Sequence, residues 1–128
     1  MKKIIAYSMA ALIVLATATA AYAADARYAY IRKFLFDGEV TATSVYGEAN
    51  IGLSSSYDSE TVITLERSSG GSFQEYRVLE SKSSTRSSYL VSAEESGLSS
   101  AYNYRLKAEL FVYDDNGNQI DYACAYVD

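Results

Sequence analysis

The residues best suited to contact another molecule lie in one alternating stretch near the C-terminus. From residue 102 to residue 113, apolar and charged side chains alternate, so a strand here would face inward with one set and outward with the other. Phe111 and Tyr113 fall on the charged side, together with Arg105 and Lys107. Rigid rings among mixed charges are typical of binding hot spots. The pattern predicts an interaction surface at these four residues, for an extracellular protein or a glycan.

The alternative for Phe111 and Tyr113 is simpler. Single exposed aromatic residues are common, and a neighbouring loop or strand end often covers them. The sequence leaves both interpretations open.

Catalytic chemistry finds little support in this chain. It has no His, which removes the general base of Ser-His-Asp and Cys-His sites. No Ser stands three residues before a Lys, so the Ser-x-x-Lys nucleophile motif is absent. Two carboxylates could serve a hydrolase, but nothing marks one pair out, and Glu94-Glu95 is most simply part of a solvated loop. We predict a protein that is not an enzyme and uses no cofactor.

The acidic segment Asp114-Asp115-Asn116-Gly117-Asn118 has oxygen ligands for calcium but not the spacing. An EF-hand loop needs oxygens at positions one, three and five and Gly at six, whereas position six from Asp114 is Gln119. Asn-Gly is the strongest short hairpin signal. We therefore predict a hairpin turn with Asn116-Gly117 at its tip. Metal sites built on His and Cys lack ligands, because the chain has no His and one Cys.

The single Cys, Cys124, excludes an intramolecular disulfide. In the expected last strand it shares a face with Ile120, Tyr122 and Tyr126, and Asp121 lies opposite. This parity predicts an inert thiol in the core. The alternative is an intermolecular disulfide, which an unpaired Cys in an exported protein permits. We expect a monomer rather than a disulfide-linked dimer.

The N-terminus has the three parts of a secretory signal peptide. A Lys pair is followed by a mostly apolar run and by the small-x-small site Ala21-Tyr22-Ala23. The run is shorter than the roughly 20 residues that span a bilayer, which favours cleavage over a membrane anchor. We predict a signal peptide at residues 1–23, and one domain at residues 24–128 that is secreted and extracellular.

Charge limits the partners of that domain. Two of the 11 basic residues lie in the signal peptide, which leaves 9 against 16 acidic residues and a net charge of −7. This charge repels phosphate backbones and anionic lipid, and no basic cluster offsets it. We expect no binding to nucleic acid, and none to membranes once the signal is removed.

The elements that must position these residues are strands. Period-two alternation runs through most of the domain, interrupted by Gly, Asn, Asp and Ser segments. Residues 37–38, 48–59, 68–72, 83–88 and 94–101 are expected to be turns or loops. The expected strands are 27–36, 39–47, 60–67, 73–81, 89–93, 102–113 and 119–127. Seven short strands predict an all-β fold, a single two-sheet antiparallel sandwich of immunoglobulin-like type, in which Tyr102 or Tyr104 would hydrogen-bond back across a corner.

Three segments carry a family resemblance. They are the hairpin from Ile63 to Phe73 with an aromatic after its glycines, the run Tyr104-Arg105-Leu106-Lys107-Ala108, and Val112-Tyr113 followed by Gly117. From about Glu39 onward the chain resembles small secreted immunoglobulin-like β-sandwich proteins of Gram-positive Firmicutes, which are mostly uncharacterised. The resemblance implies a sandwich fold and carries no catalytic residue.

The function expected from the sequence is therefore binding. We predict a secreted, non-enzymatic β-sandwich that acts by contact outside the cell. The alternative is a bacteriocin-like antimicrobial protein, which the chain resembles in size, export and Tyr content. Membrane-active peptides are cationic and amphipathic, and this chain is neither.

Overall fold

The structure is a computed structural model that describes residues 28–128. The predicted signal peptide and cleavage site lie outside the described residues. All regular structure within residues 28–128 is strand, and no helix there is long and apolar enough to cross a membrane. The strands are β1 (Ile31–Val40), β2 (Val45–Leu53), β3 (Asp58–Ser68), β4 (Gln74–Ser84), β5 (Ser88–Glu95), β6 (Asn103–Tyr113) and β7 (Gln119–Val127).

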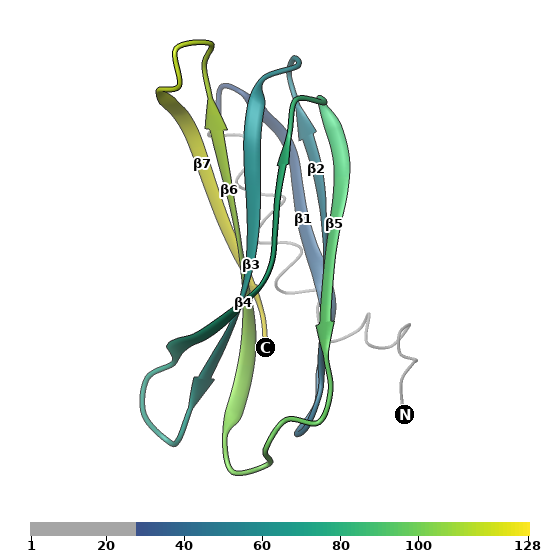
Figure 1. Cartoon of the computed structure of the whole chain (residues 1–128), viewed down its shortest axis with the longest axis vertical. Helices are drawn as coiled ribbons and strands as arrows, with labels where there is room; N and C mark the ends of the chain where they lie inside the picture. Colours follow the sequence, from purple (N-terminus) through teal and green to yellow (C-terminus); the bar gives the residue numbers. More distant parts are fainter. Residues whose placement is uncertain (1–27) are drawn as a thin grey trace.

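The strands form the predicted two-sheet antiparallel sandwich (Figure 1). One sheet has the order β1-β2-β5, and the other has the order β4-β3-β6-β7. This division follows the immunoglobulin type, except that the fourth strand pairs with the third instead of extending the first sheet. The β3–β4 hairpin bends away from the other sheet at its tip (Figure 1).

Alternate side chains of the two sheets meet in one core. As predicted, Leu106, Ala108, Leu110 and Val112 of β6 point inward, and each is fully buried. Tyr89 of β5 crosses the core, and its hydroxyl lies 2.7 Å from Ser59 Oγ of β3. This buried hydrogen bond satisfies polar atoms that would otherwise destabilise the interior, and it joins the two sheets.

The β6–β7 hairpin has the predicted turn. Asp114 Oδ1 accepts hydrogen bonds from the backbone N–H of Asn118 and of Asn116, each at 2.9 Å. Both bonds lower the pKa of the Asp114 carboxyl, and the bond from Asn118 has the larger effect. Gly117 adopts a φ of +83°, which a residue with a side chain rarely does.

The predicted corner is made by Tyr104 rather than by Tyr102. The Tyr104 hydroxyl donates a 2.7 Å hydrogen bond to the backbone oxygen of Ser99, five residues earlier. This bond fixes the connection between β5 and β6, on which Tyr102 lies.

The first hairpin is displaced from its predicted position. Asp37 and Gly38 continue β1, and the chain turns instead at residues 41–44, where the Ser44 N–H donates to Thr41 Oγ1 at 3.0 Å. Gly38 pairs with Gly47, and a Cβ on Gly38 would collide with the backbone oxygen of Tyr46. Gly38 therefore permits a close approach of two strands and makes no turn.

The loop predicted at residues 48–59 is also wrong over most of its length. Residues 48–53 continue β2, in which Ala49, Ile51 and Leu53 are buried and alternate with half-exposed Asn50 and Gly52. Asp58 and Ser59 already belong to β3. The outward residues of this segment are polar or glycine, which are typical of loops, so the alternate buried residues were not recognised as a strand.

We expect Leu110→Ala to lower the free energy of unfolding by about 2–5 kcal/mol, since the change leaves a cavity at a fully buried position. Urea melts measure the loss. Leu90→Ala is the control, because Leu90 is 51% exposed and should change stability by less than about 0.5 kcal/mol. Equal effects at the two positions would show that the β6 register is wrong.

We expect Gly38→Ala to destabilise the domain by about 1–3 kcal/mol, because the new methyl group would meet the Tyr46 backbone, which cannot rotate away. Gly71→Ala is the matched control, since its Cβ would have no heavy atom within 4 Å. If the two variants melt alike, Gly38 does not lie in a tightly paired strand.

Candidate interaction surface

The four residues singled out in the sequence lie on the outward side of β6, as their parity predicts. Arg105, Lys107, Phe111 and Tyr113 are all half-buried and alternate with the inward core residues of the same strand. We call the outward side of β3, β6 and β7 the outer face. Neighbouring strands add residues to it that the sequence alone did not point to.

The most important addition is Glu66 of β3, whose side chain is only 8% exposed. Glu66 stands opposite Arg105 in the strand register, and its Oε1 lies 2.7 Å from Arg105 Nε. Its Oε2 lies 3.5 Å from Lys107 Nζ, which is also 3.8 Å from Glu109 Oε1. A buried carboxylate is tolerated only when it is paired. Arg105 and Lys107 provide that pairing for Glu66.

Two aromatic rings hold Arg105 in place. Its guanidinium carbon lies 4.2 Å from the Tyr126 ring centre and 4.6 Å from the Phe73 ring centre. Tyr126 comes from β7, and Phe73 lies just before β4. Cation–π contacts and the ion pair with Glu66 together restrict the Arg105 side chain to one position.

The aromatic half of the outer face is also interlocked. The rings of Phe111 and Tyr122 lie 5.2 Å apart at an angle of 52°. The Tyr122 hydroxyl donates a 2.6 Å hydrogen bond to Glu109 Oε2. Phe111 is therefore partly covered by a neighbouring strand, whereas Tyr113 lies beside an open hollow of about 510 Å³ at the end of β6.

Contacts within the outer face shift three pKa values upward. Burial alone would lower the pKa of Lys107, but the Glu109 and Glu66 carboxylates outweigh it and raise that pKa. Burial and the hydrogen bond to Glu109 raise the pKa of Tyr122. Burial and the neighbouring Cys124 thiol raise the pKa of Tyr126. All three groups keep their neutral-pH charge state further into the alkaline range.

The prediction that Cys124 lies in the core is wrong. Cys124 is half-buried on the outer face, opposite Glu109, whereas Ala123, Ala125 and Val127 point inward. Both faces of β7 carry apolar residues, so the alternation of the sequence did not show which face is buried, and the prediction chose the face that carries Cys124. Inward Asp121 accepts a hydrogen bond from the Tyr30 N–H at 3.0 Å, which satisfies its charge on that side of the strand.

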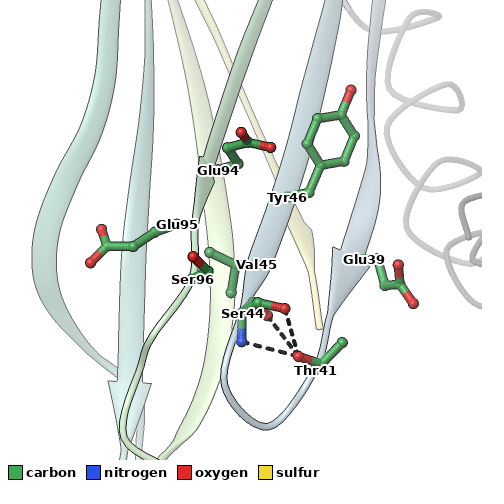
Figure 2. A pocket seen from close by; sticks show the side chains of 8 residues that line it. All are labelled: Glu39, Thr41, Ser44, Val45, Tyr46, Glu94, Glu95 and Ser96. Carbon is green, nitrogen blue, oxygen red and sulfur yellow. Dashed lines mark hydrogen bonds between the residues drawn. The ribbon is translucent and has the colours of Figure 1, made fainter. Parts of the chain in front are cut away.

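A second polar site lies where the β1–β2 turn meets the end of β5 (Figure 2). It is a hollow of about 340 Å³. The register aligns Glu39, Tyr46 and Glu94 in one row across three strands. Glu94 and Glu95, expected in a loop, are the last residues of β5, and Glu95 pairs with Arg77 at 3.0 Å.

The hollow in Figure 2 offers hydroxyls and carboxylates, and the hydroxyls of Thr41 and Ser44 lie 2.8 Å apart in hydrogen-bonding contact. Within residues 28–128, no three His, Cys, Asp or Glu side chains are grouped so that they could hold a metal ion. Of the two surfaces, the outer face has the larger set of ion pairs and ring contacts.

Comparison with known proteins gives no family. No family model and no curated protein matches the chain. Among solved structures, a β-glucuronidase of Bacteroides uniformis aligns with 73% of this chain and 12% of its own, at 11% identity and a TM-score of 0.37. A β-glucosidase of Kluyveromyces marxianus aligns with 75% of this chain and 14% of its own, at 10% identity and a TM-score of 0.33. The chain spans only a small part of either enzyme.

The raised pKa values predict a loss of stability in alkali. Lys107 and Tyr122 have ordinary pKa values of 10.5 and 10.0, and the folded state raises both. Their contribution to stability is complete below pH 10 and falls as pH rises further, because the unfolded chain releases these protons first. Chemical melts of the native protein and of Tyr122→Phe between pH 9 and 11.5 measure this slope.

The slope should be shallower in Tyr122→Phe, and between pH 6 and 8 the two proteins should show parallel pH dependence. Identical slopes above pH 10 would mean that the hydrogen bond from Tyr122 to Glu109 does not form in solution.

Proposed function

We propose that the domain is a non-enzymatic binding module that works outside the cell, with the outer face of β3, β6 and β7 as its contact surface. The proposal combines the predicted export signal with the composition of that face. Phe111, Tyr113 and Tyr122 supply apolar area, and Arg105 and Lys107 supply orientation.

One observation carries the proposal. The charged residues of the outer face are held by contacts within the domain, chiefly those of Glu66 with Arg105 and Lys107. A surface already ordered before it meets a partner loses little side-chain entropy on binding. Rigid half-buried rings contribute to affinity for the same reason.

A protein partner suits this face better than a small ligand does. The face is the side of a sheet, and small ligands need a concave site that covers most of their surface. A mixture of positive, negative and aromatic groups favours a partner of complementary pattern rather than a uniformly charged polymer.

We expect the double variant Phe111→Ser with Tyr113→Ser to bind its target about tenfold more weakly or worse, because it removes the outward rings of β6. Its free energy of unfolding should fall by only about 1 kcal/mol, since both positions are half-buried. The assay measures binding of labelled protein to whole cells, before and after protease treatment of those cells.

Leu90→Ser is the matched control, because it removes an exposed apolar side chain from the opposite sheet. A partner of protein nature predicts that protease treatment abolishes binding. Unchanged binding by the double variant would place the contact surface elsewhere, and an unfolded double variant would show that the two rings belong to the core.

A further inference from the structure

We propose that Arg67 and the hollow beside it bind a hydroxylated monocarboxylate, of the kind found in a uronic acid residue of a polysaccharide. This proposal does not rest on the function of the outer face. Arg67 lies on β3 with the parity of the inward residues Ile63 and Leu65, at the end where the hairpin bends away from the other sheet (Figure 1).

The guanidinium group of Arg67 is held by two tyrosine rings. Its central carbon lies 3.8 Å from the Tyr76 ring centre and 4.1 Å from the Tyr102 ring centre. Arg67 pairs with Gln74 of β4 and with Tyr104 of β6. The Tyr76 ring comes from β4, and the Tyr102 ring comes from the connection that leads into β6. Stacked rings occupy the faces of a guanidinium and leave its N–H edge for hydrogen bonds.

That edge has no protein acceptor in the part of the chain that the structure describes, where Arg67 makes ring contacts but no ion pair. Arg105 and Arg77 also contact rings, yet each holds a carboxylate, Glu66 at 2.7 Å and Glu95 at 3.0 Å. A half-buried arginine that is fixed in position but has no acceptor within the domain is suited to donate hydrogen bonds to an acceptor group of a ligand.

Local backbone features place the two rings. The pairing of β3 with β4 shifts between Leu65 and Glu66, which leaves Tyr76 as the extra residue of a β-bulge. Bulges redirect side chains and are frequent at binding sites. Tyr102 is held by the corner hydrogen bond from Tyr104 to Ser99, and its ring lies 6.4 Å from that of Tyr104.

The hollow beside Arg67 has a volume of about 510 Å³, enough for a sugar residue. Its lining includes Ser69, Ser72 and Gln74, which can exchange hydrogen bonds with ligand hydroxyls. It also includes Glu75, which can accept a hydrogen bond from a hydroxyl and repels a doubly charged phosphate more strongly than a singly charged carboxylate. One carboxylate with adjacent hydroxyls fits both the arginine and this lining.

The test is a titration of the isotope-labelled protein, produced from its full-length sequence, with millimolar sodium glucuronate, followed by amide chemical shifts. Shifts should cluster at residues 67–76 and at Tyr102. Glucose and the methyl ester of glucuronate should bind at least about tenfold more weakly, since neither offers a charged acceptor to Arg67.

Arg67→Lys should weaken glucuronate binding about tenfold or more, because it keeps the charge but loses the planar fork. Arg86→Lys, a change of the same kind at an exposed turn, should bind as the native protein does. If Arg67→Lys does not fold, the comparison of glucuronate with its methyl ester still decides the matter on the native protein.

Three results would overturn the proposal. The first is the absence of glucuronate-dependent shifts near Arg67. The second is equal binding of glucuronate and its methyl ester. The third is equal binding of inorganic phosphate at the same residues, which would indicate a site for any anion.

Discussion

The alternation of side chains along β6 is the constraint on which the rest of the structure depends. β6 lies between β3 and β7, and its inward residues from Tyr104 to Val112 are at most 5% exposed. A shift of one residue would move this entire set to solvent and bring charges into the core. The register is therefore unique, and it also decides which residues reach the outer face.

The same register explains how a charge can be buried outside the core. Glu66 is opposite Arg105 and diagonal to Lys107, so two cations reach its carboxylate only in this pairing. Removing both cations would leave a poorly solvated charge without a partner, which is much more costly than losing an exposed ion pair. The ion pairs on the outer face thus reinforce the register that the core residues of β6 impose.

Arg105 and Arg67 show how similar local chemistry leads to different roles. Each lies against two aromatic rings at the hairpin end of the sheet, but they are on opposite faces. Arg105 faces a carboxylate from the next strand, and this ion pair holds its side chain in place on the outer face. Arg67 has hydroxyls and an amide around it, with Glu75 in the lining of the same hollow and no ion pair within the described residues.

The sequence predicted those parts of the fold in which one side of a strand is apolar and the other charged. The β6–β7 hairpin, its Asn116-Gly117 tip and the outward position of Phe111 and Tyr113 all follow from such a pattern. Prediction from the sequence failed where both sides of a strand carry apolar residues, as around Cys124. It also failed where a glycine allows two strands to approach closely and does not form a turn, as at Gly38.

Pairing between strands was beyond the reach of the sequence. Glu66 and Arg67 are adjacent in the chain, and nothing in their local pattern shows that one is buried against Arg105 while the other lies between two tyrosines. Those roles depend on which strands flank β3 and on the bulge at Tyr76. Both are properties of the assembled sheet.

β4 is an edge strand of the four-stranded sheet, and an edge strand can pair with a strand of another molecule. Tyr76 and Val78 are 39% and 49% exposed there, and a long apolar edge would attract a further strand. Two shifts in the pairing of β4 with β3 disrupt the regular spacing that an added strand would need.

Charged residues on the inward side of β4 have a similar effect. Arg77 is paired with Glu95 of β5, and Lys82 Nζ donates to the Leu90 backbone oxygen of the same strand at 3.4 Å. These contacts tie the edges of the two sheets together along one side of the sandwich. Recognition by side chains, on the outer face or around Arg67, is accordingly favoured over recognition by strand addition at β4.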